Sequence, residues 1–138
     1  IFSPEEMKGA KHLAATHLET TLFENRNGKF YQRSIPSQAQ FSPVYKIVVE
    51  DFNKDGYNDL LLLGNNEYCR LKMGKMDANL GTVLLNDGKA NFNCAPNGET
   101  GLLIPGDTKD ALVIKINGLR YLLAGVNNST LLTYKLNQ

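Results

Sequence analysis

The stretch "DFNKDGYNDLLLLGN", residues 51–65, places a dense group of oxygen-bearing side chains directly before four leucines. The loop offers oxygen atoms at its positions 1, 3, 5, 7 and 9, from Asp51, Asn53, Asp55, the backbone carbonyl of Tyr57, and Asp59. Calcium takes about six to eight oxygen ligands, and a loop supplies them from alternate side chains and a backbone carbonyl. The spacing therefore predicts a calcium site.

The residues around these oxygens narrow the type of site. Gly56, at position 6, permits the sharp turn that a calcium loop needs. An EF-hand would carry a bidentate Glu at position 12, but that position is Leu62, inside a strand-like apolar run. The alternatives are an ion-free hairpin turn rich in Asp, Asn and Gly, and magnesium, which is disfavoured because it keeps several waters.

Composition indicates one globular domain and excludes some partners. Of the 138 residues, 42% are hydrophobic and 21% are charged. The net charge of +1 gives no basic patch for nucleic acid and no polybasic segment for a membrane surface. The apolar runs have strand length, far short of the roughly 20 residues that span a bilayer. We therefore expect neither nucleic-acid binding nor membrane insertion.

The first residues predict the one helix of the chain. Ser3 and Glu6 form a capping box, Pro4 suits the first helical position, and apolar residues recur on one face up to Leu18. We expect a helix over 4–18, with its His12 and His17 at the surface or partly packed rather than as metal ligands. Because the chain starts with neither Met nor a signal peptide, we expect a mature or excised segment.

Cys69 and Cys94 are the only cysteines. Two are too few for a disulfide scaffold or a zinc site. A single disulfide between them and two separate, packed thiols are both open alternatives.

The rest of the chain consists of strand-like runs, and it repeats itself. "LFENRNGKF" (22–30) is similar to "VLLNDGKANF" (83–92), and residues 46–66 are similar to 111–128, where an Asn117-Gly118 turn replaces the acidic loop. Without the irregular insertion that follows Asn65, the repeat has the size of a four-stranded propeller blade. The sequence therefore predicts a mainly β fold: an incomplete β-propeller of about two blades of antiparallel sheet, with one N-terminal helix.

We expect this single domain to span 1–138 and to divide into four parts. They are the helix at 4–18, the outer hairpin of a preceding blade at 20–36, a full blade with the calcium loop at 44–96, and a degenerate last blade at 107–136.

The motifs also resemble a known family. "VVEDFNKDGYNDLLL" looks like the calcium loop of FG-GAP/VCBS repeats, the blades of integrin α-chain-like β-propellers. The two hairpin segments, 22–30 and 83–92, are similar to the following hairpin of that family, although the first is one residue short and the second has Ala90 where Gly is usual. "AQFSPVYKIVVEDFNKDG" with "ETGLLIPGDTKDALV" resembles the C-terminal part of ASPIC/UnbV-type repeat proteins, which are secreted or surface-attached proteins common in Bacteroidetes.

The resemblance covers about residues 20–136 and implies calcium ligands at the five positions given above, with no catalytic residue. It also implies partners: the remaining blades of a parent chain, and a second copy that pairs through exposed sheet edges.

The function that we expect is a calcium-binding, non-enzymatic propeller segment of a secreted or cell-surface protein, with structural calcium and a role in adhesion or in binding an unidentified protein or glycan ligand. The expected location is extracellular, on the outer surface of a Bacteroidetes-type bacterium. One alternative is part of a carbohydrate-active enzyme, a polysaccharide lyase or hydrolase, although the carboxylates outside the loop form no motif. The other is a purely structural tail of a larger propeller.

Overall fold

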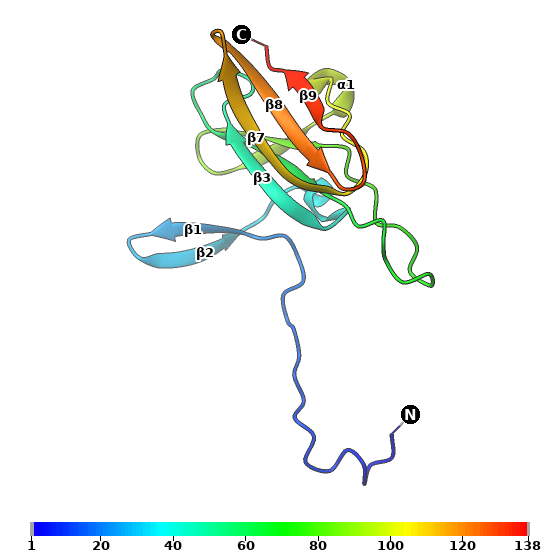
Figure 1. The fold of residues 1–138 in the computed structure, drawn as a ribbon. Coiled ribbons are helices and arrows are strands. Elements are labelled where there is room, and N and C mark those ends of the chain that lie inside the picture. The colour runs from blue at the N-terminus through cyan, green and yellow to red at the C-terminus, as the bar shows by residue number, and fades with distance from the viewer. Residues whose placement is uncertain (1, 138) are drawn as a thin grey trace.

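The structure, a computed structural model, describes residues 2–137 and confirms a mainly β fold (Figure 1). The strands are β1 (Leu22–Arg26), β2 (Lys29–Arg33), β3 (Val44–Glu50), β4 (Asp59–Gly64), β5 (Thr82–Asn86), β6 (Phe92–Ala95), β7 (Thr108–Ile116), β8 (Leu119–Val126) and β9 (Leu132–Lys135). A 3-10 turn, η1 (Ser37–Gln40), and a one-turn helix, α1 (Asn97–Thr100), complete the elements.

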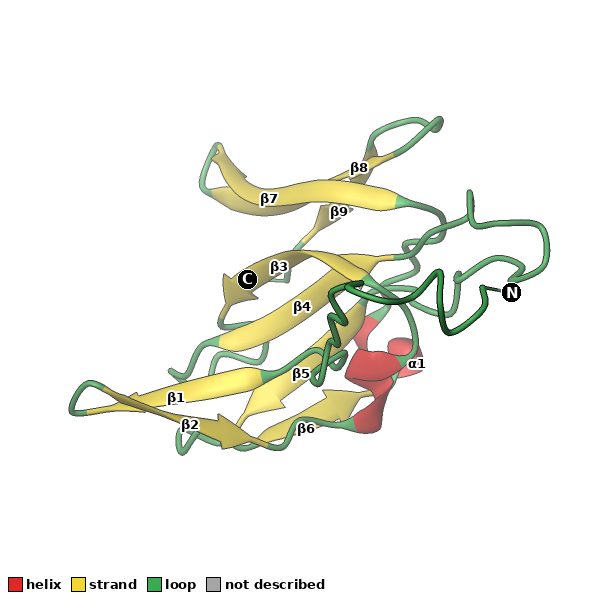
Figure 2. Cartoon of the chain, turned by 90° about the horizontal axis from the view of Figure 1, so that it is seen from below, coloured by secondary structure: helices red, strands yellow, loops and turns green. Residues whose placement is uncertain are grey.

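The strands form three antiparallel sheets, and in each sheet the strands are neighbours in sequence order. The β1–β2 hairpin stands by itself, β3 to β6 form a four-stranded sheet, and β7 to β9 form a three-stranded sheet. Figure 2 shows the three-stranded sheet lying across the four-stranded sheet, with the β1–β2 hairpin to one side. Arg33 of this hairpin donates a hydrogen bond to Asn91, just before β6.

The four leucines of the opening motif form most of β4, the strand that is buried on both faces. Leu61 and Leu63 pack between the two larger sheets, whereas Leu62 packs with Ala39 and Leu84 on the opposite face. Because successive residues of a strand point to opposite faces, an unbroken apolar run requires cover on both sides. The three-stranded sheet supplies one cover, and the segment around η1 supplies part of the other.

The larger core lies between the four-stranded and three-stranded sheets. Its buried members are Val48, Leu61, Leu63, Val83, Leu102, Ile104, Ala111, Leu122 and Ala124. These side chains lie where the two sheets face each other, and there β3 and β4 contact β7. This packing holds the loop after β3 close to the start of β8.

Polar contacts also join these sheets. Asn65, fully buried at the end of β4, donates from Nδ2 to the carbonyls of Asn79 and Gly106, at 2.7 and 3.0 Å. At the surface, Lys46 of β3 forms an ion pair of 2.5 Å with Asp110 of β7, and this hydrogen bond lowers the pKa of the Asp110 carboxyl. The buried amide is fully bonded, as burial of a polar group requires.

The β3–β4 and β7–β8 hairpins share the same irregularities. The pairing shifts between Val44 and Lys46 in the first, and between Thr108 and Asp110 in the second. Just past each pair, the backbone N–H of Asn65 donates to Pro43 and that of Asn127 donates to Asp107, at 3.0 and 2.8 Å. Gly64 is therefore level with Val126.

The expected helix over 4–18 is absent. The capping box forms, since Ser3 N–H donates to Glu6 Oε2 and Glu6 N–H donates to Ser3 Oγ, but only turns follow over residues 4–9 and irregular chain after them. Gly9 adopts a φ of +84°, and Leu13 and Leu18 remain 78% and 86% exposed. An isolated helix of this length is marginal in water without a packed apolar face. Among the described residues no helix has the length and hydropathy that crossing a membrane requires.

Candidate metal centre

Asp51 organises the loop that connects β3 to β4. Its Oδ1 accepts hydrogen bonds from the backbone N–H groups of Lys54 and Asp55, at 2.7 and 3.2 Å, and its Oδ2 accepts one from Gly56 at 3.0 Å. Lys54 and Gly56 have φ values of +63° and +89°. Because glycine adopts positive φ freely, Gly56 lets the chain wrap around this carboxylate.

Asn53 and Asp55 lie beside Asp51 in the same turn. The Asn53 amide donates to Asp55 Oδ2 at 2.8 Å, and its carbonyl oxygen accepts from the Asp55 N–H at 3.1 Å. Asp55 Oδ1 accepts from the Tyr57 N–H at 2.9 Å. The side chains at positions 1, 3 and 5 are thus brought together, and all of them are oriented by the loop's own backbone.

Asp59 occupies a different environment at the start of β4. Its side chain is fully buried. Oδ2 accepts from the backbone N–H of Phe52 and Oδ1 accepts from that of Asn86, both at 2.9 Å. One carboxylate therefore joins the beginning of the loop, the central strand β4 and the end of β5.

Tyr57 and Asn86 attach the loop to the turn between β5 and β6. A Cβ at Gly88, which has a φ of +77°, would lie 2.5 Å from Cζ of the Tyr57 ring, so this close contact requires glycine. Asn86 also donates from Nδ2 to the carbonyl of Asn58 at 3.0 Å. Asn86 lies 27 residues from Asp59 in the sequence and carries no local signal that marks it as part of this site.

The donor set of the loop contains oxygen atoms alone, which is the chemistry of a hard cation such as calcium. Each carboxylate oxygen can accept more than one bond, so the backbone contacts leave lone pairs for a ligand. Among residues 2–137, however, no three His, Cys, Asp or Glu side chains lie close enough together to hold a metal ion. Asp51 is bonded to the Asp55 N–H within the loop, whereas Asp59 is bonded to the N–H of Phe52, the residue after Asp51.

The remaining candidate ligands lie elsewhere. Cys69 and Cys94 are both free thiols, and burial raises the pKa of Cys94. His12 and His17 are exposed on the N-terminal segment.

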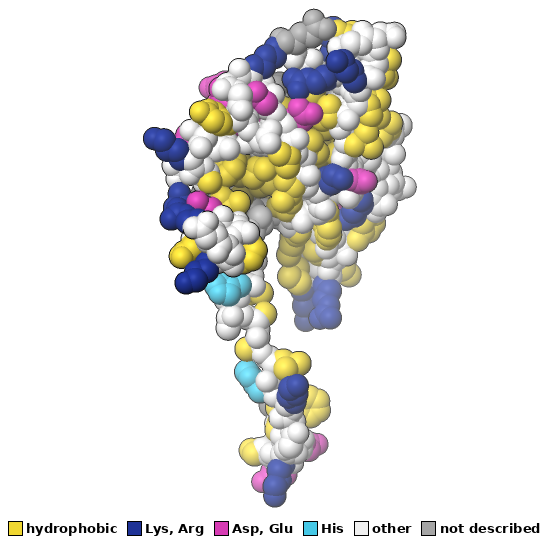
Figure 3. Space-filling view, turned by 90° about the vertical axis from the view of Figure 1, so that its left-hand side faces the viewer, with side chains coloured by type: hydrophobic (Ala, Val, Ile, Leu, Met, Phe, Trp, Pro, Cys, Tyr) yellow, Lys and Arg dark blue, Asp and Glu magenta, His cyan; other side chains and the backbone are white. Residues whose placement is uncertain are grey.

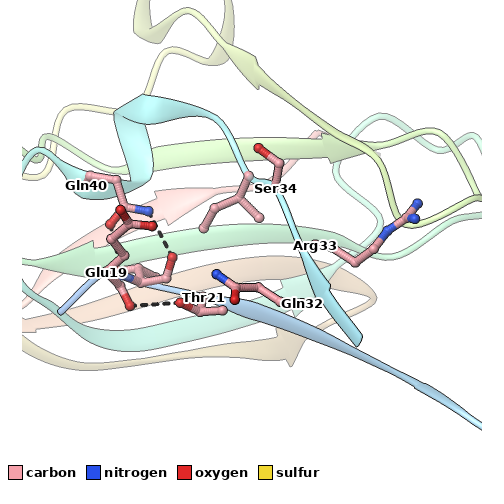
Figure 4. A pocket seen from close by; sticks show the side chains of 8 residues that line it. Glu19, Thr21, Gln32, Arg33, Ser34 and Gln40 are labelled. Atoms are coloured by element: carbon pink, nitrogen blue, oxygen red, sulfur yellow. Dashed lines mark hydrogen bonds between the residues drawn. The ribbon is translucent and has the colours of Figure 1, made fainter. Parts of the chain in front are cut away.

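A separate hollow of about 220 Å³ lies between the N-terminal segment, β2 and η1 (Figure 4). Gln40 spans it: Nε2 donates to the Thr20 carbonyl and Oε1 accepts from the Thr20 N–H, both at 2.8 Å. This paired contact fastens the chain before β1 to η1. Among its lining residues, Glu19 is the acidic one and Arg33 the basic one, and they form no ion pair with each other.

No family model, no curated protein and no solved structure matches this chain. The resemblance to FG-GAP/VCBS repeats therefore rests on the quoted motifs alone and stays a proposal.

Proposed function

We propose that the chain is a calcium-binding, non-enzymatic segment of a β-propeller, in which the 51–59 loop holds a structural ion. The observation that carries the proposal is the combination of this oxygen-only loop with Asp59, a fully buried carboxylate. None of the ion pairs formed within residues 2–137 includes Asp59. A buried carboxylate is stable only when it is bonded and its charge is compensated, and calcium would supply that charge.

The ion would be held by Asp51, Asn53, Asp55 and Asp59 through side-chain oxygens and by Tyr57 through its carbonyl. Bound calcium would contribute positive charge between carboxylates that otherwise repel each other by about 3 kcal/mol per pair at about 5 Å and an effective dielectric of about 20. Because Asp59 and Tyr57 also contact the β5–β6 end of the sheet, an ion here would stiffen that whole end.

The way in which the two larger sheets stack supports a propeller. With Gly64 level with Val126, Leu60 and Leu62 of β4 correspond to Leu122 and Ala124 of β8. The face of the first sheet that carries Leu61 packs against the face of the second that carries Leu122. The front of one sheet thus covers the back of the next, as in successive blades of a propeller.

The setting that best suits such a loop is extracellular. Sites in extracellular modules bind calcium with dissociation constants of about 10⁻⁴ to 10⁻³ M, which match the millimolar calcium outside cells. We propose a secreted or cell-surface protein, on a Bacteroidetes-type bacterium by the family resemblance, with a role in adhesion or in binding a protein or glycan.

Thermal unfolding with calcium and with chelator tests the proposal. At a dissociation constant of about 10⁻⁴ M and about 1 mM calcium, binding to the folded state alone stabilises it by about 1.4 kcal/mol. For a chain of this size we expect the melting temperature to rise by about 5 °C. Magnesium at the same concentration should give a smaller shift.

Matched variants locate the effect. Asp55→Asn keeps the shape of the side chain but removes a charge, so the calcium shift should shrink strongly. Asn58→Ser changes a neighbouring exposed residue whose side chain is not in the donor set, and it should keep the full shift. A melting temperature that calcium leaves unchanged in the wild-type protein would refute the proposed site.

A further inference from the structure

The outer edge of β9 is an open edge of the three-stranded sheet. Within residues 2–137, β9 pairs with β8 on one side and with no strand on the other. The N–H of Leu136 donates to the Arg120 carbonyl, at 2.9 Å, on the β8 side. Because backbone groups alternate along a strand, those of Thr133 and Lys135 point away from β8. They form the hydrogen-bonding row that an added strand requires.

In the four-stranded sheet, the edge that corresponds to the open edge of β9 is covered by a further strand. Leu84 of β5 pairs with Leu60, and Tyr134 of β9 pairs with Leu122, so β9 stands where β5 stands in the other sheet. The outer edge of β5 is covered by β6, with Leu84 opposite Cys94 and Asn86 opposite Phe92. A strand on β9 would therefore place its inward side chains opposite Tyr134 and Leu136.

An open cavity lies beneath this edge. Its volume is about 450 Å³, within the range of ligand pockets. Its apolar lining comes from strands of both sheets and from the segments next to them: Phe52, Val83, Leu85, Ala95, Leu102, Tyr134 and Leu136. Several of these residues also pack against the core between the sheets, so the cavity continues an interface that the fold already uses.

We infer that the β9 edge and this cavity together accept one extended peptide segment of a partner chain. The segment carries a large apolar residue and a small apolar residue two positions apart, as Phe92 and Cys94 are in β6. Its backbone pairs with Thr133 and Lys135, and its two apolar side chains enter the cavity. This mode is strand addition, in which the backbone supplies affinity and the pockets supply specificity. The inference does not depend on calcium.

A single strand fits this edge better than a second copy of the chain. On the β9 side the four-stranded sheet reaches one strand further than the three-stranded sheet, because β5 and β6 line the cavity under β9. A second copy that paired its own β9 here would bring its own four-stranded sheet into the same space. An isolated peptide strand avoids that overlap.

The test uses a fluorescein-labelled peptide with the sequence of residues 89–96 and alanine in place of Cys94, titrated with the whole protein by fluorescence anisotropy. We expect saturable binding. Thr133→Pro removes an outward N–H without touching the β8 side, and should weaken binding by about tenfold or more. Thr133→Ala keeps the N–H and should bind as the wild type does.

A second pair of changes tests the cavity. Ala95→Leu places a larger side chain in the cavity without altering β9. A peptide with serine in place of the phenylalanine lacks the large apolar side chain that would occupy the cavity. Each change should also weaken binding by about tenfold. Absence of peptide binding, or equal binding by Thr133→Pro, overturns the inference. So does a dimer of the free protein in sedimentation that Thr133→Pro dissociates, because the occupant would then be a second copy.

Discussion

Of the three carboxylates in the loop, that of Asp59 is the one withdrawn from solvent, because its side chain is fully buried. Asp51 and Asp55, in contrast, are at least partly accessible to solvent. Asp59 accepts one backbone N–H on each oxygen, from Phe52 and Asn86. It therefore has a structural role with or without calcium: removing it leaves two partly buried donors unpaired.

We predict that Asp59→Asn lowers the free energy of unfolding by about 2–4 kcal/mol even in chelator, since the amide can accept only one of the two bonds and turns its own N–H₂ toward the other. Urea unfolding in chelator measures this. Asp87→Asn is the control, because Asp87 makes similar bonds to Lys89 and Asn91 in an exposed turn where water can replace them. If Asp59→Asn lost only the calcium response, Asp59 would act as a ligand and not as a structural bridge.

At the scale of elements, the sequence predicted the structures that depend on neighbouring residues, and it failed for those that depend on packing between distant segments. The strands around the Asn27-Gly28 and Asn117-Gly118 turns formed because such turns match the twist of a hairpin. The helix over 4–18 failed although its capping box formed, because a cap satisfies only the first turn and nothing packs against Leu13 or Leu18. The hydrogen bond from the Asn86 N–H to Asp59 could not be predicted from the sequence, because it depends on how β5 lies against β4.

The two similar hairpins suggest an exchange of elements. Glu50 and Asp59 are level with Ile114 and Tyr121, so residues 115–121, "KINGLRY", can replace residues 51–59 without changing the register of the strands. The exchange removes every proposed calcium ligand, including the buried carboxylate.

We predict that the exchanged chain folds with the same far-ultraviolet circular dichroism and shows no change of melting temperature between calcium and chelator. Retention of the calcium shift would mean that the ion binds elsewhere. Failure to fold would mean that the loop itself, through Asp59 and Tyr57, is required to build the sheet.

At the scale of the whole molecule, one face of the three-stranded sheet is covered by the other sheet, whereas the equivalent face of the four-stranded sheet is partly exposed along β3. Val113 of β7 packs against the core between the sheets, whereas Val49, level with it on β3, is 54% exposed. Ile47 on the same face is 47% exposed. Figure 3 shows hydrophobic side chains gathered across one face of the folded part, with the N-terminal segment extending away from it. A stack of blades that continued beyond this chain would cover the face of β3.

This difference predicts unequal effects of the same substitution. Val113→Lys should lower the free energy of unfolding by about 2–3 kcal/mol, because it places a charge against the core. Val49→Lys should change it by less than about 0.5 kcal/mol, as expected at an uncovered surface position. Urea unfolding of both variants, with sedimentation of the wild type, gives the comparison. Equal destabilisation by the two lysines would show that the β3 face is covered in solution, and a wild-type dimer that Val49→Lys dissociates would identify the cover as a second copy.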